Sequence, residues 1–245
     1  MLGAHGTNVS SMGTAILFAV IASVALPLGA AIGAWRPPAR KVTAGLLAFA
    51  SGALITAVAF ELFEDAFEGG GATRAAIAFL AGATVFIVVD TWLDNYTHRK
   101  HATGGAVGFA LLAGVTLDGI PENLAMGVGL VESTSATLLV AIFASNLPEA
   151  IVGAEKMREA GLQAKRIMLI WTATAVLLAL AVVAGYGALE GVSEETLAWP
   201  LGFAAGAVLA SLADTLMPEA FEEGGPWIAY LTSLGFLLSF FVSTL

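Results

Sequence analysis

Eight long hydrophobic stretches, separated by short polar loops, make up almost the whole of the 245-residue chain. Each stretch has about 20 residues, the length that an α-helix needs to cross a bilayer. The pattern therefore predicts an all-α, polytopic membrane protein that forms a single transmembrane domain over 1–245. The expected spans are about 13–35, 42–66, 73–96, 105–130, 136–157, 167–189, 197–220 and 227–245.

Spans four and five are interrupted near their centres by similar polar motifs. A carboxylate within hydrocarbon costs about 3 kcal/mol even on lenient insertion scales, and a proline in a helix interior removes a backbone hydrogen bond. Two consecutive spans that both carry a proline and a carboxylate at corresponding positions predict a polar site. Each helix of the pair would contribute one copy of the motif, and the two copies would face each other. The motifs are Asp118-Gly-Ile-Pro-Glu122-Asn123 and Ser145-Asn146-Leu-Pro-Glu149.

The loops give the expected orientation. Of the 10 Lys and Arg residues, nine fall in the loops that follow spans one, three and five, and Arg74 alone falls on the other face. By the positive-inside rule, the basic face lies in the cytoplasm and both termini lie outside. We therefore expect a multi-pass protein of the inner or plasma membrane.

Composition narrows the function classes. Apolar residues make up 58% of the chain and charged residues 12%, against roughly 25% charged residues in a soluble domain. The net charge of −9 and the few basic residues argue against a nucleic-acid partner. The absence of cysteine excludes disulfides and thiolate metal sites. The lipid bilayer is an expected partner, and a homodimer is left open.

An internal repeat links the two ends of the chain. The segment from Gly52 to Gly69 aligns without a gap with the segment from Gly206 to Glu223, at an offset of 154 residues. These segments belong to spans two and seven, which run in opposite directions across the membrane. The sequence thus predicts an inverted repeat that relates helices 1–3 to 6–8 and helix 4 to helix 5, an arrangement common in alternating-access transporters.

The central motifs point to cation chemistry. Asp118 and Glu122 are four residues apart and share one helix face, as do Ser145 and Glu149. No Lys, Arg or His near this level of spans four and five balances the carboxylates, so protons or a metal must do so. Protonated acids that merely hydrogen-bond between helices are the structural alternative. Further acidic or amide side chains could line a pathway: Asn123, Asp214, Glu219, Glu61, Glu64 and Asp65.

These motifs resemble those of the ZIP (Zrt/Irt-like) family of divalent metal transporters, near its bacterial branch. The resemblance covers nearly the whole chain and includes span seven, Gly202-Phe-Ala-Ala-Gly-Ala-Val-Leu…Met217-Pro-Glu-Ala. It implies a mid-membrane metal site whose ligands would be Asp118, Glu122, Ser145, Asn146 and Glu149.

The motifs depart from the family at two ligand positions. Asp118 stands where members have His, and Ser145 stands where they have His or Gln. An all-oxygen site suits Mn²⁺ or Mg²⁺ better than Fe²⁺ or zinc, and the cargo stays open among these four metals. Span six also lacks the carboxylate that members often use for a second metal, so one or two sites are both open.

We therefore expect a transporter that carries a divalent metal cation into the cytoplasm. The alternative is a proton or monovalent-cation pathway on the same fold with metal binding lost. An intramembrane enzyme is not expected, because the chain has no catalytic His-Glu-x-x-His or Gly-x-Ser-x-Gly motif and no span histidine. No organic cofactor is expected. A purely structural subunit would leave the buried carboxylates unexplained.

Overall fold

The computed structural model describes residues 11–99, 116, 119–131 and 136–244, and the described residues form helices and turns without any strand. Five of the described helices are long and apolar enough to cross a membrane. The longest of these stretches, Arg40–Leu93, has 54 residues and is broken at Gly71. The other four membrane-length helical stretches are Met12–Trp35, Ala136–Glu159, Ala164–Leu189 and Glu194–Gly224. The described part of the chain is therefore all-helical and suited to a bilayer.

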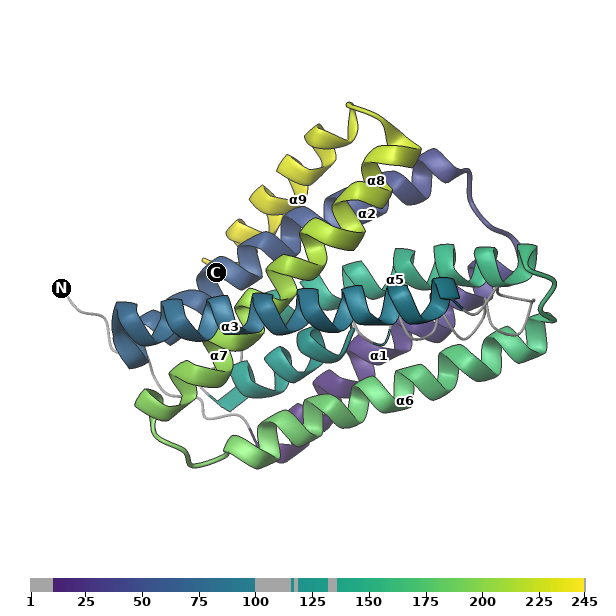
Figure 1. Ribbon diagram of the computed structural model, residues 1–245. Helices are drawn as coiled ribbons and strands as arrows, with labels where there is room; N and C mark the ends of the chain where they lie inside the picture. Colours follow the sequence, from purple (N-terminus) through teal and green to yellow (C-terminus); the bar gives the residue numbers. More distant parts are fainter. Residues whose placement is uncertain (1–10, 100–115, 117–118, 132–135, 245) are drawn as a thin grey trace.

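Four helices begin and end within a few residues of expected spans one, five, six and eight, whereas spans two and seven are each divided among an α-helix, a π-helix and a further α-helix (Figure 1). Expected span four lies partly outside the described residues, and its described part is helical over 119–131. The elements are α1 (Met12–Trp35), α2 (Arg40–Ala57), η1 (Val58–Phe63), α3 (Glu64–Arg99), α5 (Ala136–Glu159), α6 (Ala164–Leu189), α7 (Glu194–Ser211), η2 (Leu212–Leu216), α8 (Met217–Gly224) and α9 (Ile228–Ser243).

Two backbone irregularities recur at the offset of the sequence repeat. The π-helices η1 and η2 begin at Val58 and Leu212, which are 154 residues apart. Gly71 and Gly225, also 154 residues apart, both have φ of 77°. This left-handed region strongly favours glycine, so each glycine turns the chain sharply where a helix ends. The repeat therefore extends from the sequence to the backbone.

Close backbone approach also follows the repeat. Four glycines pack two helix pairs so tightly that a Cβ atom at any of them would overlap a carbonyl oxygen of the facing helix. Small residues of this kind let apolar helices approach closely in a bilayer. The two interfaces correspond contact by contact: Gly52 with Thr232 and Gly235 with Phe49 between α2 and α9, and Gly206 with Phe79 and Gly82 with Phe203 between α3 and α7.

A second set of glycines packs the helices that carry the central motifs. Gly33 of α1 lies against the carbonyl oxygen of Ile151 in α5, and Gly185 of α6 lies against that of Leu124. Leu124 and Ile151 are 27 residues apart, the offset of the two Pro-Glu motifs. The helical segment 119–131 thus packs on α6 much as α5 packs on α1.

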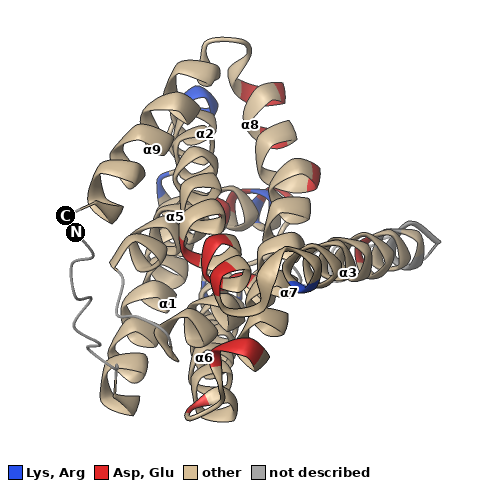
Figure 2. Cartoon of the chain, turned by 90° about the vertical axis from the view of Figure 1, so that its left-hand side faces the viewer, with Lys and Arg blue, Asp and Glu red and all other residues tan. Residues whose placement is uncertain are grey.

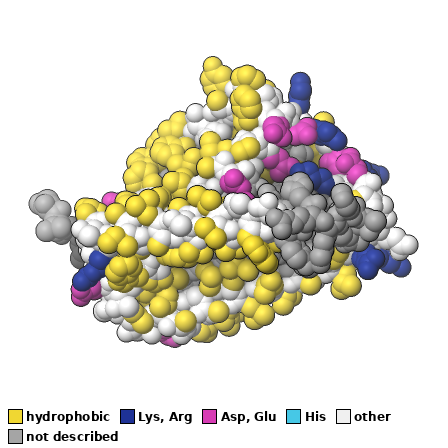
Figure 3. Space-filling view, in the orientation of Figure 1, with side chains coloured by type: hydrophobic (Ala, Val, Ile, Leu, Met, Phe, Trp, Pro, Cys, Tyr) yellow, Lys and Arg dark blue, Asp and Glu magenta, His cyan; other side chains and the backbone are white. Residues whose placement is uncertain are grey.

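Charged side chains are sparse along the helices and gather toward their ends. Figure 2 shows α1 and α9 in tan, without Lys, Arg, Asp or Glu, and acidic residues along the short helix α8. Hydrophobic side chains spread over the face in Figure 3, with most charges near its two ends. α6 illustrates the pattern, because Leu169 is 70% exposed and Leu180 is 59% exposed. Such surfaces suit contact with lipid tails.

Candidate functional site

The two central motifs meet through Glu122 and Ser145. Ser145 Oγ lies 3.2 Å from Glu122 Oε2, within hydrogen-bond distance, and 3.0 Å from the carbonyl oxygen of Ile142. The Glu122 side chain is 2% exposed and Ser145 is fully buried. A hydroxyl has one proton to donate, so Ser145 can donate to the carboxylate or to its own helix at any moment. The site therefore contains a buried carboxyl group held against a neutral oxygen of the facing helix.

Two amide side chains lie beside these residues in the sequence and are also buried. Asn146 Nδ2 donates to the carbonyl oxygen of Ala22 in α1 at 3.4 Å, and Asn123 Nδ2 donates to that of Gly119 at 2.8 Å. Both Oδ1 atoms are buried and accept no hydrogen bond from any described residue. A buried acceptor left unsatisfied costs about 1–3 kcal/mol. A cation or a water molecule at either oxygen would remove that cost.

Of the two remaining predicted ligands, Glu149 and Asp118, only Glu149 lies among the described residues. Glu149 is partly buried on α5, one turn beyond Ser145, and Asp118 lies outside the described residues. Within the described part of the chain, no group of three or more His, Asp or Glu side chains lies close enough to hold a metal ion. The structure thus brings together Glu122 and Ser145, with one further carboxylate, Glu149, on the same face of α5.

Apart from Asn123, the predicted pathway residues lie on η1, α3, η2 and α8. Glu61 is partly buried in η1, whereas Asp214 is exposed in η2. Single-turn π-helices occur often at functional sites, and both of these carry a carboxylate. Glu64 is exposed on α3, where Asp65 is partly buried. Glu219 is partly buried on α8.

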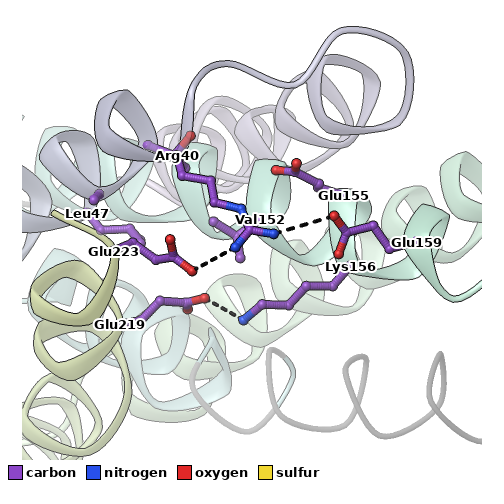
Figure 4. Close-up of a pocket in the computed structure, with 10 residues that line it drawn as sticks. Arg40, Leu47, Val152, Glu155, Lys156, Glu159, Glu219 and Glu223 are labelled. Carbon is purple, nitrogen blue, oxygen red and sulfur yellow. Dashed lines mark hydrogen bonds and ion pairs between the residues drawn. The ribbon is translucent and has the colours of Figure 1, made fainter.

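Sequence reasoning missed a group of ion pairs that joins α5 to α2 and α8 (Figure 4). Lys156 Nζ pairs with Glu219 Oε1, and Arg40 pairs with Glu223 at 3.4 Å and with Glu159 at 3.6 Å. The positive-inside pattern predicts that Arg40 and Lys156 lie on the cytoplasmic face. It gave no sign that either would pair with these glutamates, because the partners are 63, 183 and 119 residues apart in the chain.

Comparisons with known proteins add no family assignment. A scan against protein-family models gave no match, and a search of curated proteins gave no significant match.

Proposed function

We propose that this protein carries a divalent metal cation across a membrane into the cytoplasm, in the manner of the ZIP-like transporters that its motifs resemble. The cargo would bind between the helical segment 119–131 and α5, with Glu122, Ser145, Asn146 and Glu149 as ligands and Asp118 as a further one. The metal is here the substrate, so no resident cofactor is required. Eight spans with both termini outside remain part of this proposal.

The observation that carries the proposal is the buried oxygen group at the two Pro-Glu motifs. A carboxylate and a hydroxyl are in contact between the two helices, and the two amide oxygens next to them in the sequence are buried without a hydrogen bond from a described residue. Oxygen donors of this kind suit hard divalent ions. The repeated backbone irregularities support the inverted-repeat architecture that many transporters share.

A proton or monovalent-cation pathway is the second candidate. It is favoured by one observation: no three His, Asp or Glu side chains gather within metal-binding distance in the described residues. One carboxylate with neutral oxygens would suffice for a proton or Na⁺. The two candidates differ in what binds the folded protein, and this difference gives the test.

The test is the thermal stability of the purified protein with Mn²⁺, Mg²⁺, Fe²⁺ or Zn²⁺, each against a metal-free control. A ligand that binds the folded state raises the melting temperature by mass action. We expect a rise with at least one divalent ion and none in the Glu122→Gln variant. A melting temperature unmoved by every divalent ion, with proton uptake retained, would favour the second candidate.

Binding should weaken as the solution becomes more acidic. Metal ligands must be deprotonated, so protons compete with the cation for the carboxylates. Because neighbouring carboxylates release protons as a coupled set, we expect the apparent affinity to fall steadily from roughly pH 8 to pH 5. The measurement is cation affinity at several pH values. An affinity that stays constant over this range would mean that protons do not compete with the cation, either because the carboxylates are fully ionised throughout or because they are not ligands.

A further inference from the structure

Three ion pairs connect α2, α5 and α8 at the expected cytoplasmic end of the molecule. Figure 4 shows Lys156 reaching from α5 to Glu219 of α8, while Arg40 of α2 lies between Glu223 of α8 and Glu159 of α5. Each pair links helices that are far apart in the sequence. Glu219 is the least exposed of these side chains, at 25%, and Lys156 is 49% exposed.

These residues line a pocket that lies close to the proposed cation site. The pocket has a volume of about 110 Å³ and is lined by residues of α2, α5 and α8. Val152 lies in its wall, three residues after Glu149 on α5. Residues three apart on a helix lie on the same side, so the pocket begins about one turn from Glu149. The pocket is therefore an opening on the Glu149 side of α5, with its mouth defined here by Lys156 and Glu219.

We propose that Lys156 closes this opening by occupying Glu219 as a tethered cation. The proposal rests on the proposed function, because it assigns a gate to that cation path. While the ammonium holds the Glu219 carboxylate, a cation leaving the site meets a positive charge at the mouth. When Lys156 swings away, Glu219 becomes an acceptor for the departing cation, and the mouth is open.

The energetics of these ion pairs suit a gate. Partly exposed ion pairs contribute little to stability, because water and salt screen them and two long side chains must be ordered. Such a pair can break and reform without unfolding its helices. Arg40 also connects α5 and α8, because it pairs with Glu159 and with Glu223. Loss of the Lys156–Glu219 pair alone should therefore make the mouth more accessible without separating the two helices.

The test uses the absence of native cysteine. Val152→Cys introduces a single thiol in the pocket wall, and its rate of reaction with a charged thiol reagent is measured on the purified protein. We expect slow labelling in this parent variant compared with Lys165→Cys, which is exposed on α6. Adding Lys156→Met or Glu219→Gln should each raise the labelling rate of Val152→Cys by roughly 1.4- to fivefold, the range that loss of one exposed ion pair allows.

The matched control is Arg74→Met in the same Val152→Cys background. Arg74 pairs with Glu195 at 2.5 Å and, at 41%, is about as exposed as Lys156, but neither Arg74 nor Glu195 lines the pocket. This control should label at the parent rate. Unchanged labelling in Lys156→Met and Glu219→Gln, or parent labelling as fast as Lys165→Cys, would overturn the gate.

A measurement of cation uptake distinguishes failure of the gate proposal from failure of the transport proposal. If labelling accelerates as expected but no form of the protein takes up a divalent cation, Lys156 and Glu219 still close the pocket, but the transport proposal fails. If wild-type uptake is observed and is lost in Glu122→Gln, while labelling is unchanged by Lys156→Met, transport stands and the gate fails.

Discussion

Glu122→Gln should abolish uptake of the divalent cation by proteoliposomes that contain the purified protein. The substitution keeps the size of the side chain and its contact with Ser145 but removes the negative charge from the centre of the buried group. A neutral amide cannot replace a carboxylate as a charged ligand in a low-dielectric site, where electrostatic interactions are strongest. Glu149→Gln should have the same effect, because the repeat relates the two positions. The measurement is the initial rate of uptake.

Two controls make this result interpretable. Glu68→Gln also removes one negative charge, but from an exposed side chain on α3, and it should leave uptake unchanged. The thermal stability of Glu122→Gln without metal should remain close to that of the wild type, which shows that the variant folds. Uptake at the wild-type rate by folded Glu122→Gln would exclude the central site as the cation path.

Gly206→Leu should destabilise the protein strongly, because it forces a side chain into the backbone of α3. A Cβ at this position already overlaps the carbonyl oxygen of Phe79, and a backbone atom cannot move aside as a flexible side chain can. Overpacking of this kind costs about 1–3 kcal/mol or more, which corresponds to a fall in melting temperature of roughly 2–12 °C for a chain of this size. Gly52→Leu should act similarly, since Gly52 meets the carbonyl oxygen of Thr232.

Gly129→Ala is the matched control for these variants. A Cβ at Gly129 would lie 3.6 Å from Leu138 Cδ2, an ordinary contact distance. Because alanine also favours the helix over glycine by about 1 kcal/mol, this variant should be as stable as the wild type or more so. Equal melting temperatures for Gly206→Leu and the wild type would mean that α3 and α7 do not pack as described.

The contact at the candidate site could be anticipated from the sequence, because it follows from spacing. The offset of 27 residues between the Pro-Glu motifs and the four-residue spacing within each motif put Glu122 and Ser145 on helix faces that could meet. The role of α1 could not be anticipated. Asn146 donates to the backbone carbonyl of Ala22, and nothing in the identity of an alanine marks its carbonyl as an acceptor.

The helix bounds were also largely predictable, whereas the ion pairs and the π-helices were not. A run of apolar residues indicates a span because the bilayer fixes its length. The partner of Lys156, by contrast, is decided by how α5 and α8 pack, since its long side chain could reach several glutamates. A π-helix inserts one residue into a helical turn without altering the hydrophobic pattern enough to reveal it.

The matched π-helices carry information about the origin of the chain. A π-helix adds one residue to a turn and rotates everything beyond it, so two independent insertions at equivalent points of two segments are an improbable coincidence. The irregularities at Val58 and Leu212 are more simply explained if they were inherited from one ancestral segment. The insertion would then be older than the duplication that doubled the chain, and both copies would have kept it while most of their side chains diverged.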